Sequence, residues 1–62
     1  MRTGFLVMYA EEKGGLSSKN RGVFLNENDA KEAAKGYGWW GSDGKVVPIP
    51  IFDSYNEFVE NQ

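Results

Sequence analysis

Two prolines separated by one residue restrict how this chain can build a sheet. Pro48 and Pro50 lie within an otherwise strand-like segment that runs from Lys45 to Phe52. Alternate residues of a strand direct their N–H groups to the same edge, so both missing donors fall on one edge. A central strand needs donors on both edges. The pattern therefore predicts that residues 45–52 form a border strand that pairs through one edge only.

A second segment, residues 5–10, is typical of the centre of a sheet. It reads Phe-Leu-Val-Met-Tyr-Ala and is apolar at both odd and even positions. Strands of this composition are usually covered on both faces. Residues 21–25 predict a further short strand. The polar residues 11–20 between the two strands predict a hairpin connection with a long, mobile tip that contains Gly14 and Gly15.

Residues 26–37 predict the main helix. Asn26 is a favourable N-cap, and apolar residues then recur at the spacing of one helix face. These positions are Ala30, Ala33, Ala34 and Tyr37. Because three of them are alanines, the helix should approach the sheet closely. Gly36 or Gly38 should end the helix in the left-handed conformation.

Two further local signals follow the helix. The sequence Ser42-Asp43-Gly44 predicts a turn in which Gly44 has a positive φ. Ser54, followed three residues later by Glu57, predicts a capping box at the start of a short C-terminal helix, with Asp53 as the alternative cap. The buried side of that helix is predicted to consist of Tyr55, Phe58 and Val59.

Together these segments predict a single small globular α+β domain over residues 1–62, with the order β-β-α-β-α. A three-stranded mixed sheet in the spatial order 2-1-3 fits both strand predictions, since the apolar strand then lies in the middle and the proline strand at the border. The main helix covers one face of this sheet. Only the short C-terminal helix and the aromatic loop remain for the other face, so we expect self-association as one means of covering it.

Composition narrows the possible functions. The 62 residues include no cysteine and no histidine, which excludes disulfides, the usual zinc sites and a conventional catalytic triad. We therefore expect no enzyme activity, no cofactor and no metal. The net charge of −2 argues against nucleic acid as a partner, and no apolar run is long enough to span a membrane. These features are typical of a cytoplasmic protein.

The most distinctive candidates for binding are the adjacent tryptophans Trp39 and Trp40. Tryptophan is enriched at binding hot spots, whereas in so small a domain one ring is expected to fill the core and the other to be partly exposed. With Tyr37 and Phe52 they form the predicted binding surface. Two alternatives remain: single-stranded nucleic acid on the sheet aromatics, and a small ligand or carbohydrate stacked on the tryptophans.

The C-terminal two-thirds of the chain also carries a recognisable pattern. It runs Asp29-Ala-x-x-Ala-Ala34, then Gly38-Trp-x-Gly41, then Asp43-Gly44-x-Val-x-Pro-Ile-x-Ile-Phe-Asp-Ser54. This pattern resembles small uncharacterised bacterial and phage-borne proteins of similar length. The resemblance implies a non-catalytic accessory protein and assigns no functional residue. We therefore expect a protein-interaction module by which a phage or prophage modulates a host protein, with single-stranded nucleic-acid binding as the alternative.

Overall fold

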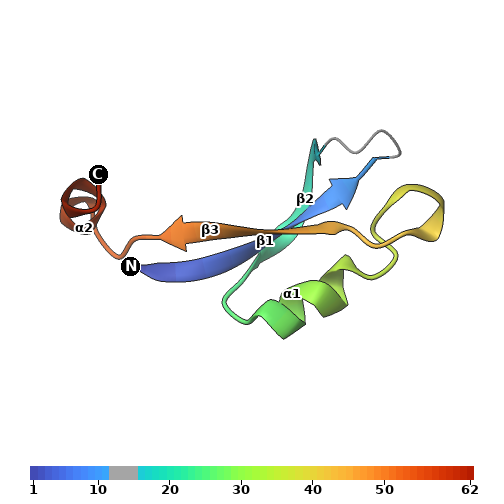
Figure 1. The fold of residues 1–62 in the computed structure, drawn as a ribbon, viewed down its shortest axis with the longest axis horizontal. Coiled ribbons are helices and arrows are strands. Elements are labelled where there is room, and N and C mark those ends of the chain that lie inside the picture. Colours follow the sequence, from blue (N-terminus) through green and yellow to red (C-terminus); the bar gives the residue numbers. More distant parts are fainter. Residues whose placement is uncertain (12–15) are drawn as a thin grey trace.

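Three strands, one main helix and a short C-terminal helix make up the fold (Figure 1) in the computed structural model, which describes residues 1–11 and 16–62. The elements follow the predicted order, with one short 3-10 turn added before the last strand. They are β1 (Arg2–Ala10), β2 (Leu16–Phe24), α1 (Glu27–Ala34), η1 (Trp39–Gly41), β3 (Lys45–Ile51) and α2 (Tyr55–Glu60).

The sheet has the predicted strand order, β2-β1-β3, with β1 in the centre and β3 at the border. Pro48 lies opposite Phe5 and Pro50 opposite Thr3, so hydrogen bonding to β1 falls to the residues between and beside the prolines. Both pairings are antiparallel, so the sheet is antiparallel. The prediction of a mixed sheet was wrong in this respect. The reason is that β2 and β3, which run in the same direction, are separated by β1 and never pair.

β2 is longer than the sequence suggested. It begins at Leu16, so residues 16–20, predicted as part of a loop, pair with β1 instead. Backbone hydrogen bonds to a neighbouring strand do not require apolar side chains, and an edge strand tolerates polar ones. The pairing passes from Gly22 opposite Val7 to Asn20 opposite Met8, which leaves one extra residue in β2 between them. The predicted hairpin tip at residues 14 and 15 lies outside the described residues.

α1 starts as predicted and ends earlier. The Asn26 side-chain oxygen Oδ1 accepts hydrogen bonds from the backbone N–H groups of Asn28 (2.8 Å) and Asp29 (3.3 Å). The helix ends at Ala34 rather than at residue 37, and Gly36 has the left-handed φ of 72°. A left-handed residue stops the helix, and the chain then turns back toward the sheet.

A small apolar core joins α1 to one face of the sheet. Val7 of β1 and Ala30 of α1 are fully buried, and Ala34 is almost so. The partly buried residues packed around them are Phe5, Phe24, Ala33, Tyr37 and Val46. The odd-numbered residues of β1 therefore face α1, and the predicted alanine face of the helix is confirmed.

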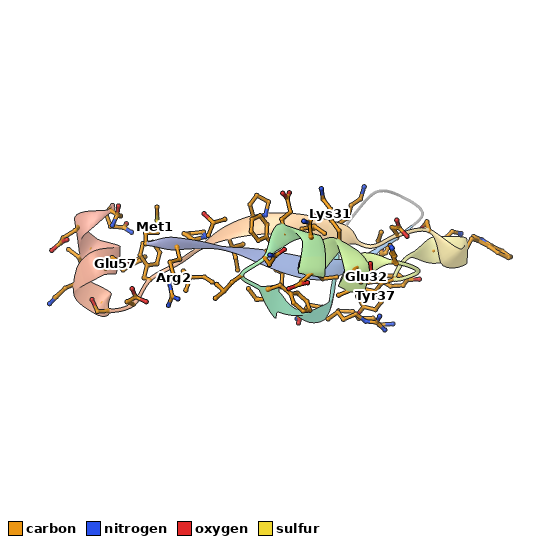
Figure 2. The ribbon with its side chains drawn as sticks, turned by 90° about the horizontal axis from the view of Figure 1, so that it is seen from below. Met1, Arg2, Lys31, Glu32, Tyr37 and Glu57 are labelled. Carbon is orange, nitrogen blue, oxygen red and sulfur yellow. The ribbon has the colours of Figure 1, made fainter. Side chains whose placement is uncertain are left out.

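α2 lies beyond the end of the sheet, next to the start of β1 (Figure 1). The Ser54 hydroxyl oxygen accepts a hydrogen bond from the Glu57 backbone N–H at 3.2 Å, as the predicted cap requires. The side chain of Glu57 points elsewhere, because its Oε1 atom lies 2.6 Å from the Met1 ammonium (Figure 2). Because this helix has no sheet beneath it, the side predicted to be buried is exposed. The exposed residues are Tyr55, Phe58 and Val59.

Candidate binding surfaces

The loop of residues 36–44, which we call the Trp loop, lies at the end of the molecule opposite α2 and is yellow in Figure 1. Trp39 is 43% exposed and Trp40 is 88% exposed. Neither ring fills the core, contrary to the expectation that one of them would. Alanine and valine side chains already fill the space between α1 and the sheet. Both tryptophans belong to η1, which lies outside that space.

Trp40 has an unusual backbone conformation. Its φ of 56° and ψ of 34° place it in the left-handed region, and it is the one non-glycine residue with a positive φ among those the structure describes. This conformation costs a non-glycine residue roughly 1–2 kcal/mol. The Trp40 ring meets Trp39 edge-on, with 6.1 Å between ring centroids. The loop thus presents a large apolar ring to solvent on a strained backbone.

Hydrogen bonds across the base of the Trp loop hold this conformation. The Gly44 N–H donates to the Ala34 carbonyl oxygen at 2.7 Å, and the Gly36 N–H donates to Asp43 Oδ1 at 3.2 Å. Within the loop, the Ser42 hydroxyl donates to the Trp39 carbonyl oxygen at 2.7 Å. The two ends of the loop are therefore tied to the end of α1. These hydrogen bonds therefore fix the conformation of the loop in the free protein.

Gly44 has a different role from the one predicted for it. The left-handed conformations of the loop lie at Gly36, Trp40 and Gly41, whereas φ at Gly44 is not positive. A Cβ atom at Gly44 would lie 2.8 Å from the Met8 carbonyl oxygen and 2.9 Å from that of Tyr37. Glycine is needed here because the loop backbone passes directly against β1.

The structure separates the four predicted site residues. Tyr37 lies on the helix side of the sheet, where its ring meets Tyr9 edge-on at 5.6 Å and the Arg21 guanidinium lies 4.6 Å from its centroid. Phe52 lies near α2, and its ring meets Phe58 edge-on at 5.3 Å. Tyr37 belongs to the Trp loop but is partly buried, so of the four residues Trp39 and Trp40 are the two exposed neighbours. Phe52 lies at the opposite end of the molecule.

The face of the sheet turned away from α1 forms a second candidate surface. Gly4 identifies it, because a Cβ atom there would lie 2.5 Å from Ile51 Cδ1 and 2.9 Å from Val23 Cγ1. The two outer strands therefore bring apolar side chains together over β1. We call this set the open face, and it comprises Leu6, Met8, Val23, Val47, Ile49 and Ile51. The period-two alternation of β1 and β3 is the sequence signal that assigns these residues to one face.

The open face carries no aromatic ring among the described residues. The rings that suggested nucleic-acid stacking, Phe5 and Tyr9, lie on the side of α1: Phe5 packs against the core, and Tyr9 meets Tyr37. Both rings are partly buried on that side.

Charged groups form ion pairs on α1 and near α2. The Lys35 ammonium lies 2.9 Å from Glu32 Oε2, and this hydrogen bond together with the charge of Glu32 raises the pKa of Lys35. At the α2 end, Arg2 lies 2.8 Å from Asp53. Over residues 1–11 and 16–62, acidic side chains nowhere gather in a group suited to holding a metal ion.

No helix in the described part of the chain has the length and apolar character to cross a bilayer. No family model, no curated protein and no solved structure matches the chain. Assignment of a function therefore depends on the geometry of its own side chains.

Proposed function

We propose that this protein is a non-enzymatic binding module that recognises another protein through Trp40. The observation that carries the proposal is an indole that is 88% exposed and held on a left-handed backbone by a hydrogen-bonded loop. Strained residues of this kind concentrate at functional sites, because strain without a use is readily removed by substitution. The resemblance to phage-borne proteins makes a bacterial protein the partner to seek first.

The chemistry of the Trp loop favours a partner with an apolar pocket. Tryptophan is among the residues most enriched at hot spots, where truncation to alanine costs at least about 2 kcal/mol of binding free energy. The loop is already ordered by its contacts with Ala34 and Asp43, so little conformational entropy is lost when the ring is buried. Trp39, which lies edge-on to Trp40, widens the apolar contact.

A pull-down with a matched control tests this proposal. The bait is the tagged protein in a bacterial lysate, compared with its Trp40→Ala and Tyr55→Ala variants. Tyr55 is also a highly exposed aromatic residue, but it lies on α2 at the other end of the molecule. We expect a partner that binds the wild type and Tyr55→Ala and is lost, by at least about thirtyfold in affinity, with Trp40→Ala. Equal recovery with all three baits would reject Trp40 as the contact residue.

Fluorescence gives a direct measure on the same surface. The chain has two tryptophans, so Trp39→Phe leaves Trp40 as the single indole. Its emission should be that of a water-exposed indole in the free protein and should shift to shorter wavelength when the recovered partner is added. An unchanged spectrum at saturating partner would show that Trp40 stays in water in the complex.

A further inference from the structure

The open face is an apolar surface to which all three strands contribute side chains. It consists entirely of aliphatic side chains and one methionine, drawn from all three strands. Val23 is 48% exposed and the others are partly exposed. Charged and polar residues lie at both ends of this face: Lys45 and Asn20 are opposite Met8, and Arg2 is opposite Ile51. The face thus has an apolar centre with a polar border, as protein interfaces do.

The molecule also exposes more surface than a folded monomer of its mass. The accessible area is 4557 Å², whereas a typical monomer of 6.9 kDa exposes about 4,000 Å². The excess of roughly 560 Å² per chain belongs to the whole molecule, because the Trp loop and α2 are exposed as well as the open face. The radius of gyration agrees, at 13.3 Å against about 10.6 Å for a compact domain of this length.

The core of a single chain is correspondingly small. Among the described residues, the fully or almost fully buried apolar side chains are those of Val7, Ala10, Ala30 and Ala34, of which only Val7 is larger than alanine. Domains of this size are marginally stable, and many gain stability from a disulfide, a metal, dense packing or association with another chain. Cysteine and histidine are absent from the sequence, so dense packing and association are the sources open to this chain.

We propose that a second copy of this chain covers the open face. Homodimer interfaces are the most apolar class of interface, and the absence of charge from the centre of this face favours a like surface over a charged partner. Packing two such sheets face to face, about 10 Å apart, gives a four-layer helix–sheet–sheet–helix dimer. Dimerisation by sheet extension at β3 is opposed, because Pro48 and Pro50 remove donors from its free edge.

The dimer does not depend on the Trp40 proposal, because the Trp loop lies at the end of the molecule and contributes no residue to the open face. Trp40→Ala should therefore keep the dimer mass while losing the heterologous partner. The two proposals can fail separately.

Sedimentation velocity at low and high micromolar concentration tests the dimer. The wild type should sediment at twice the chain mass of 6.9 kDa. Val23→Lys and Ile49→Lys each place an ammonium in the apolar centre and should sediment as monomers. The matched control is Asn28→Lys, which adds the same charge on exposed α1 and should remain dimeric. Circular dichroism establishes that each variant is folded.

A monomeric wild type at all concentrations would overturn the proposal. So would a dimer that survives both open-face lysines, or one that the Asn28→Lys control also abolishes. If the lysine variants are unfolded, the dimer is tested instead with Val23→Cys carrying a nitroxide label. The natural chain has no cysteine, so this is the single site of labelling. A short label-to-label distance between chains supports the face-to-face dimer, and no dipolar signal overturns it.

Discussion

At the scale of single residues, Trp40 combines two features that a stable fold alone would avoid. Its ring is almost wholly in water, and its backbone is left-handed. Neither feature contributes to the core, which is built on Val7 and the alanines of α1. The hydrogen bonds from Gly44 to Ala34 and from Gly36 to Asp43 offset the strain and hold the ring outward. Stability and recognition therefore place opposite demands on this position.

Substitution of Trp40 by asparagine should stabilise the protein. Asparagine tolerates the left-handed conformation, so Trp40→Asn should raise the free energy of unfolding by up to about 1 kcal/mol. This corresponds to a melting temperature about 4–8 °C higher in a domain of this size, measured by circular dichroism. The control is Trp39→Asn, which removes a partly buried ring at a residue without a positive φ. This variant should have a lower melting temperature than the wild type. Equal losses for the two variants would contradict the assignment of strain to Trp40.

At the scale of elements, β3 shows how local covalent chemistry determines a position in a sheet. Its prolines lie opposite Thr3 and Phe5, and its one neighbour is β1. The outer edge of β3 consequently lacks the donors at positions 48 and 50, and this protects it from pairing with other chains. Pro48 and Pro50 therefore both identify β3 as a border strand in the sequence and prevent its outer edge from pairing with other chains.

Restoring these N–H donors should allow the outer edge of β3 to pair with strands of other molecules. In the double variant Pro48→Thr and Pro50→Thr, β3 gains two outward N–H groups and keeps a strand-favouring composition. We expect aggregates that bind thioflavin T to form at concentrations at which the wild type stays clear. The control Lys45→Thr introduces threonine at an exposed residue of the same strand without adding a donor, and should behave as the wild type. An equally clear solution of the double variant would show that the prolines have no protective role.

At the scale of the whole molecule, the fold is one helix on one side of a long sheet, with α2 set beyond the end of the strands (Figure 1). The Met1–Glu57 ion pair (Figure 2) holds α2 to the start of β1, and so does the Arg2–Asp53 ion pair just before α2. This arrangement lengthens the molecule to 42 Å and leaves the open face without a cover in the described part of the chain. Stability should therefore depend on association.

If two chains share the open face, thermal stability should rise with protein concentration. Association that occurs only in the folded state shifts the unfolding equilibrium by mass action. We expect the wild-type melting temperature to increase over a dilution series, while that of folded Val23→Lys stays constant. A concentration-independent melting temperature for the wild type, measured by scanning calorimetry, would count against a dimer coupled to folding.

The sequence by itself determined the features that depend on local chemistry. The border position of β3 follows from the missing donors of Pro48 and Pro50, and the start of α1 follows from the capping oxygen of Asn26. Strand order was predictable because the apolar composition of β1 and the prolines of β3 are both local features. The alanine face of the helix was predictable because apolar residues recur at helical spacing. These elements were therefore predicted before any neighbour was known.

The tertiary structure decided what depends on a neighbour. β2 extends back to Leu16 because β1 supplies its hydrogen bonds, whatever the polarity of the segment. The apolar side of α2 is exposed because no strand lies beneath it, and both tryptophans face solvent because the core is already filled by small side chains. Burial depends on what surrounds a residue, so the same kind of apolar pattern was right for α1, which lies on the sheet, and wrong for α2, which does not. The sequence singled out the tryptophan pair and an uncovered sheet face, whereas the exposure of both indoles and the distance of Phe52 from them were found only in the tertiary structure.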